Sequence, residues 1–149
     1  MSASLRRVPM NVWIVTAEDA PANVIARGLE HAGWACRRFE DAEAADQAAR
    51  TEPPDAYVVL DPCPPWGVAG LLSRLRESDA EAGRPVLVVG VGDVELRTRL
   101  LDLGADDVLP ANVAPEELLA RLRRRSALFR RATVASTRGA EDRVAVVDA

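Results

Sequence analysis

Short apolar runs alternate along the chain with segments of helical periodicity. The runs at residues 11–15, 55–60 and 85–91 are apolar almost throughout, as expected of parallel strands that are buried on both faces of a sheet. Weaker strands are predicted at residues 34–39, which are more polar and suit a sheet edge, and at residues 107–109. Because strand and helix signals alternate, the pattern predicts an α/β fold with a doubly wound, five-stranded parallel sheet.

The helices are predicted from apolar residues that recur at helical spacing. They cover residues 21–32, 42–50, a segment around Leu71, Leu72 and Leu75, residues 94–103, and residues 115 to about 131. Gly33 and Gly104 suit the C-terminal ends of the first and fourth helices. In the fifth helix, Glu116 and Glu117 lie in the first turn and arginines crowd the end, an order that the helix dipole favours.

The loops that follow the strands hold the candidate functional residues, because ligands gather at the carboxyl ends of the strands in an open sheet of this kind. Four loops qualify: residues 16–20, 61–67, 90–93 and 110–114. Asp61 directly follows the apolar run at residues 55–60 and is the candidate for a reactive carboxylate. The favoured interpretation of Asp61 is nevertheless structural, since a carboxylate at the end of a strand can cap a neighbouring helix or accept hydrogen bonds from loop amides.

Composition narrows the class of protein. A chain of 149 residues, 48% hydrophobic and 28% charged, suits one globular domain with a short tail. The net charge of -4 gives no support to direct nucleic-acid binding. Cys36 and Cys63 are too few for a disulfide framework, and no run approaches the roughly 20 apolar residues of a membrane span. We therefore expect a cytoplasmic protein. The single histidine, His31, lies near the end of a predicted helix and is expected on the surface.

Two segments resemble a known family. GADDVL at residues 104–109 and PEELLAR at residues 115–121 are similar to the fifth strand and fifth helix of the response-regulator receiver domains of two-component signalling. The resemblance extends over residues 11–131, and the spacing from the first strand to residues 32–34 fits the family without a gap. It implies a flavodoxin-like (βα)5 receiver fold.

The family's phosphoryl-transfer chemistry needs side chains at five positions. Two acidic residues after the first strand hold Mg²⁺, an aspartate after the third accepts the phosphoryl group, and a hydroxyl residue and a lysine bind its oxygens. The resemblance places these positions, in that order, at Thr16, Ala17, Asp61, Gly90 and Ala111. Only Asp61 has the required side chain. The resemblance therefore implies an atypical receiver that is not an enzyme, uses no cofactor, Mg²⁺ included, and leaves Asp61 unphosphorylated.

Two alternatives stay open at this degenerate pocket. Glu18 and Asp19 would serve as displaced metal ligands in a receiver that still accepts a phosphoryl group. In the other alternative the chain is a stand-alone adaptor that binds a protein or a small ligand in a pocket rebuilt from Thr16, Asp61, Trp66 and Gly90.

Receivers of the OmpR/PhoB type dimerise through the fourth helix, fifth strand and fifth helix, and the resemblance extends to this surface. It implies three opposite-charge pairs across a two-fold axis: Arg97 with Glu117, Asp102 with Arg123, and Asp107 with Arg121. A two-fold interface uses each pair twice. The alternative is a solvated helix surface, since exposed ion pairs contribute little one by one. We expect a homodimer that forms without phosphorylation.

The ends of the chain complete the predicted organisation. Residues 1–10 are an N-terminal arm. Residues 132–149 are assigned to a linker and the start of a C-terminal winged-helix domain, because residues 132–140 have the small, polar composition of a flexible linker. Residues 143–148 resemble the opening strand of the winged-helix domain that follows receivers of this type, and a strand added to a sheet edge is the alternative. DNA would then be bound by a C-terminal domain outside this chain.

Overall fold

The computed structural model describes residues 10–78 and 83–148, with side chains as far as residue 131. Its centre is one parallel sheet of five strands, as predicted, and the strand order is β2-β1-β3-β4-β5. The strands are β1 (Asn11–Val15), β2 (Ala35–Phe39), β3 (Ala56–Leu60), β4 (Val86–Val89) and β5 (Asp107–Leu109).

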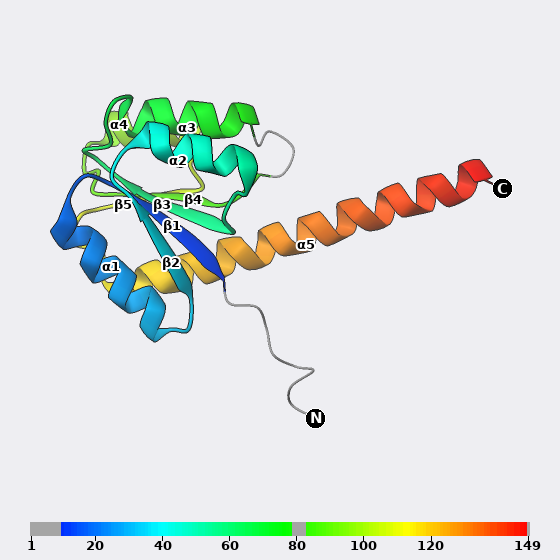
Figure 1. Cartoon of the computed structure of the whole chain (residues 1–149), viewed down its shortest axis with the longest axis horizontal. Helices are drawn as coiled ribbons and strands as arrows, with labels where there is room; N and C mark the ends of the chain where they lie inside the picture. Colours follow the sequence, from blue (N-terminus) through cyan, green and yellow to red (C-terminus); the bar gives the residue numbers. More distant parts are fainter. Residues whose placement is uncertain (1–9, 79–82, 149) are drawn as a thin grey trace.

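Helices cover both faces of this sheet (Figure 1). α1 and α5 pack together on one face, and α2 and α3 pack together on the other, beside α4. The helices are α1 (Asp19–His31), α2 (Ala42–Thr51), α3 (Gly67–Ser78), α4 (Val94–Asp102) and α5 (Pro115–Asp148).

Alternate residues of the central strands feed two separate apolar cores. In β1, Val12 and Ile14 belong to the core beneath α1 and α5, whereas Trp13 and Val15 belong to the core beneath α2 and α3. The Trp13 ring lies 4.7 Å from the Phe39 ring, centroid to centroid. Burial on both faces is why the predicted central strands are apolar at nearly every position.

The largest difference from the predicted strands is in β4. β4 ends at Val89 rather than at Val91. Gly90 adopts φ +97°, a conformation that favours glycine, and it turns the chain out of the sheet. The N–H groups of Gly90 and Val91 then both donate to the carbonyl oxygen of Leu109, at 2.8 and 3.3 Å.

The prediction for the C-terminal segment was wrong as secondary structure. Residues 132–148 continue α5, so they form neither a flexible linker nor a strand at residues 143–147. The physical reason is that no proline follows Pro115 and only Gly139 weakens an otherwise helix-compatible sequence. With 34 residues the helix is about 51 Å long, and its second half extends away from the sheet (Figure 1). The assignment of residues 132–149 to the start of a further domain stays a prediction, and residues 1–9 of the predicted arm lie outside the described residues.

Arg76 joins α3 to the segment that enters β5. Its guanidinium donates to the carbonyl oxygens of Gly104 and Arg84, at 2.6 and 2.8 Å, and to the Asp106 carboxylate at 2.8 Å. Asp106 also accepts from the N–H of Val86, the first residue of β4, at 2.8 Å. One partly buried cation therefore fixes two chain segments that are far apart in sequence.

We expect Arg76→Ala to lower the free energy of unfolding by about 2–3 kcal/mol, because it leaves a carboxylate and two carbonyl groups without their charged donor. Urea unfolding followed by circular dichroism measures the change. Arg27→Ala, at an exposed site in α1, is the matched control and should change stability by less than about 0.5 kcal/mol. Equal losses in the two variants would contradict the role given to Arg76.

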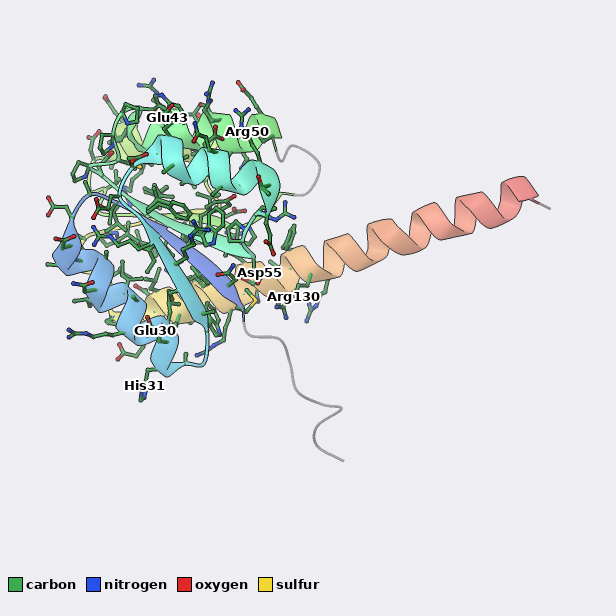
Figure 2. The ribbon with its side chains drawn as sticks, in the orientation of Figure 1. Glu30, His31, Glu43, Arg50, Asp55 and Arg130 are labelled. Atoms are coloured by element: carbon green, nitrogen blue, oxygen red, sulfur yellow. The ribbon has the colours of Figure 1, made fainter. Side chains whose placement is uncertain are left out.

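Two further observations concern the surface. His31 lies in the last turn of α1 and is exposed, as predicted (Figure 2). Within residues 10–78 and 83–148, no helix combines the length and apolar character needed to cross a bilayer.

Candidate functional site

Asp61 lies at the end of β3 and is exposed to solvent. Its Oδ1 accepts a hydrogen bond from the N–H of Val68, the second residue of α3, at 3.2 Å. This contact satisfies an otherwise free amide at the helix start and places a negative charge near the positive end of the helix dipole. The hydrogen bond to an amide of the neighbouring helix that was predicted for Asp61 is therefore present.

Thr16 and Ala17, at the family's two acidic positions, form hydrogen bonds that stabilise the loops. Thr16 is fully buried, and its Oγ1 accepts from the N–H of Glu18 at 3.2 Å in a local turn. The N–H of Ala17 donates to the carbonyl oxygen of Pro62 at 2.9 Å. Ala17 thus connects the loop after β1 to the loop after β3, and Thr16 holds the turn of its own loop.

The donor set does not fit the family's Mg²⁺ site. Where two carboxylates are required, the chain has the buried hydroxyl of Thr16 and the methyl group of Ala17. Of the displaced candidates, Asp19 is engaged by Arg38, whose Nη1 lies 2.6 Å from its Oδ1. In the part of the chain that the structure describes, no three acidic, histidine or cysteine side chains gather in a way that would hold a metal ion. Two of the carboxylate ligands that the family supplies to Mg²⁺ are therefore replaced here.

A cavity of about 460 Å³ opens beside Asp61, between α1 and α5 at the carboxyl edge of the sheet. Glu18, Asp61, Gly90 and Ala111 line it at this edge, so these predicted pocket residues do come together. The rest of its wall is made of aliphatic side chains and small residues from both helices, the ends of β3 and β4, and the loop before α5: Pro21, Val24, Ile25, Gly28, Leu29, Leu60, Val89, Val113, Pro115, Leu118 and Leu119.

Two of the four residues predicted for the rebuilt pocket, Thr16 and Trp66, do not line the cavity, and neither does Ala17 of the degenerate family site. Trp66 packs instead on the other face of the sheet, where the Arg74 guanidinium lies 4.5 Å from its ring centroid. The aliphatic wall was missed from the sequence, although Gly28 inside a helix is a signal of close packing: a Cβ built there would lie 3.8 Å from the Cβ of Pro115.

Cys63 follows Asp61 closely in sequence but is chemically protected. Its side chain is 2% exposed. Burial raises the pKa of Cys63 to about 12, and the carboxylates of Asp61 and Asp41 add to the effect. The thiolate, which is the reactive form, is therefore scarce at neutral pH. This environment does not suit a redox-sensitive thiol.

The predicted dimer residues behave as two groups. The guanidinium of Arg121 donates hydrogen bonds to Asp107 at 2.8 Å and to Glu117 at 3.4 Å within one subunit, and the bond to Asp107 is the main reason that the pKa of Arg121 is raised. Arg97 is partly buried, and its Nε has no hydrogen-bond partner among the described residues. These four side chains lie on or beside α4, β5 and the adjoining side of α5.

Arg123 lies on a different side of α5. It follows Arg121 by two residues, which is about 200° around a helix, with the buried Leu122 between them. Arg123 instead borders a shallow surface hollow with Arg124, Ala127 and Leu128. The position of Arg123 argues against its predicted pairing with Asp102 on the surface that carries Asp107, because linear spacing does not show which side of the helix each residue occupies.

Comparisons with known proteins place the chain among bacterial regulators, although no family model matches it. It is 33% identical over 127 residues to the transcriptional regulatory protein TcrX of Mycobacterium tuberculosis, covering 85% of this chain and 52% of that protein. It is equally identical, over 127 residues, to the response regulator MprA of Mycolicibacterium vanbaalenii, covering 85% and 53%. Identity to the phosphate regulon regulator PhoB of Pseudomonas aeruginosa is 30% over 119 residues, covering 78% and 51%. The chain thus spans about half the length of the curated relatives it matches.

Solved structures agree with the fold. A response regulator from Chloroflexus aurantiacus superposes with a TM-score of 0.76 at 27% identity, covering 80% of this chain and 99% of that one. The receiver domain of the sensor histidine kinase PA1611 of Pseudomonas aeruginosa superposes with a TM-score of 0.73 over the same shares of the two chains. Its identity is 18%, so this second likeness concerns the fold alone.

Proposed function

We propose that this chain, which belongs to the receiver domains of OmpR/PhoB-type response regulators, mediates the dimerisation of a DNA-binding transcription regulator. Dimerisation takes place without phosphorylation of the domain. In this function the domain is not an enzyme, uses no metal, and acts in the cytoplasm. DNA is bound by a domain outside this chain.

The observation that carries the proposal is the replacement of the phosphoryl site. Asp61 keeps its carboxylate but holds it against the start of α3. The metal positions hold Thr16 and Ala17, and the lysine position holds Ala111, so no side chain there neutralises the charge of a transferred phosphoryl group. Regulation by phosphorylation needs that neutralisation.

The surface of α4, β5 and α5 supports the dimer part of the proposal. Arg97, Asp107, Glu117 and Arg121 provide two charges of each sign, the composition that a self-complementary two-fold surface requires. An exposed apolar side chain accompanies them on α4, where Leu101 is 48% exposed. In the dimer, Glu117 of a second copy would pair with the guanidinium of Arg97, a partly buried residue of α4.

Phosphorylation and assembly are separated by one experiment with acetyl phosphate and Mg²⁺. We expect the intact mass of the protein to stay unchanged and its sedimentation to be that of a dimer both with and without the phosphodonor. A mass gain of one phosphoryl group that disappears in Asp61→Asn would instead establish the alternative of a phosphoaccepting receiver. A wild-type monomer at micromolar concentration would contradict the dimer.

A further inference from the structure

The cavity between α1 and α5 has the size of a small-molecule site. Its volume of about 460 Å³ falls in the range that encloses drug-sized ligands. Apolar surface is left uncovered there: Val24 is 55% exposed, and Ile25 and Leu119 are only partly buried although they pack against the apolar core. Apolar surface gathered in a concave site, with a few polar groups at one edge, is the usual form of a ligand pocket.

The charged groups of the cavity all have one sign. Glu18 and Asp61 are the titratable side chains among its lining residues. Neither carboxylate forms an ion pair with another described residue, and the described contact of the Asp61 side chain uses only Oδ1. Arg38, the nearby cation, is taken up by Asp19 and by the carbonyl oxygen of Thr16. The edge of the cavity is therefore negative, and it favours a cationic group over an anionic one.

An anion has little to bind in this place. The lining has Gly90 and Ala111 at the positions where the family resemblance expects a hydroxyl and an ammonium group. The amides of Gly90 and Val91, which could otherwise hold an anion, both donate to the carbonyl oxygen of Leu109. The pocket thus differs in charge as well as in shape from a phosphoryl site.

From this arrangement we propose that the cavity binds a small apolar molecule that carries a protonated amine. The apolar body lies between α1 and α5, against Val24, Ile25, Leu118 and Leu119, and the amine lies beside Glu18 and Asp61. Binding is non-covalent, and it does not depend on the dimer proposed above.

The test uses three probes that share one skeleton and differ in charge: para-phenylbenzylamine, para-phenylbenzyl alcohol and para-phenylbenzoate. NMR titration of the full chain at neutral pH gives the Kd of each. We expect the amine to bind most tightly, the alcohol less tightly and the benzoate most weakly. In Glu18→Gln and Asp61→Asn, each of which removes one negative charge, the preference for the amine over the alcohol should fall by roughly two- to fivefold per carboxylate.

A pair of neighbouring variants tests the location. Ala111→Phe fills the cavity edge and should abolish binding of the amine, whereas Asn112→Phe, next to it but outside the lining, should not. Benzoate binding as tightly as the amine, no binding of any probe at millimolar concentration, or an amine preference that survives both charge variants would each overturn the proposal. The charge variants keep the test valid even if Ala111→Phe fails to fold.

Discussion

Arg97→Glu is expected to be monomeric under conditions in which the wild type is a dimer, and so is Glu117→Arg. Arg97 lies on α4 and Glu117 on α5, and the proposed two-fold axis brings each against the other in a second copy. Every substitution therefore removes two attractions and creates two repulsions. At about 0.5–1 kcal/mol for each such term, the loss is about 2–4 kcal/mol, and the dimer Kd rises by roughly 30- to 1000-fold.

The double variant with both charges reversed decides whether the two residues are partners. Arg97→Glu combined with Glu117→Arg should sediment as a dimer again, because the opposite signs are restored across the interface. Arg123→Glu is the matched control: it makes the same charge change on the side of α5 away from Asp107 and should leave the dimer intact. A double variant that stays monomeric although folded would show that these residues do not pair. A monomeric Arg123→Glu would show that the interface includes the side of α5 that carries Arg123.

Leu122→Ala is expected to lower the free energy of unfolding by about 3–5 kcal/mol. The Leu122 side chain is 0% exposed and belongs to the core with Val12, Ile14 and Leu29, where α5 packs on the sheet. Truncation removes apolar contacts and leaves a cavity that a sheet covered on both faces cannot close by a small shift. Domains are stable by only about 5–15 kcal/mol in total, so this one substitution should remove a large part of the stability.

Urea unfolding of wild type and variant measures the loss. Val24→Ala is the control, because the same kind of truncation at a side chain that is 55% exposed should change stability by less than about 1 kcal/mol. Losses of similar size in the two variants would mean that the N-terminal half of α5 contributes little to holding the domain together.

The sheet could be predicted because burial on both faces leaves a local mark on the sequence. β3 is buried at each of its five positions, and a short apolar run between turn residues is typical of a strand in that environment. The C-terminal part of α5 was missed for the opposite reason. Small and polar residues are as compatible with a helix as with a linker, and their composition alone does not decide between them.

The candidate site was predicted at its edge and missed in its interior. Asp61, Gly90 and Ala111 follow strands, so the alternation of the chain already brings them to one edge of the sheet. The cavity behind them depends on how closely α1 and α5 approach, and Gly28 and Pro115 lie at one point where the two helices meet. The position of Arg123 and the bond of Arg121 to Asp107 inside one subunit likewise depend on the rotation of α5. Linear spacing carries little of this information.

The length of α5 turns it into a lever. Leu118 and Leu119 of this helix line the cavity, and Glu117 and Arg121 belong to the proposed dimer surface. The same helix then continues away from the sheet to Asp148, about 39 Å beyond Leu122 at the usual helical rise (Figure 1). If the helix stays straight, a tilt of about 5° at the cavity displaces its far end by roughly 3 Å. Small changes in packing between α1 and α5 would therefore be transmitted outward as larger movements, with no rearrangement of the sheet.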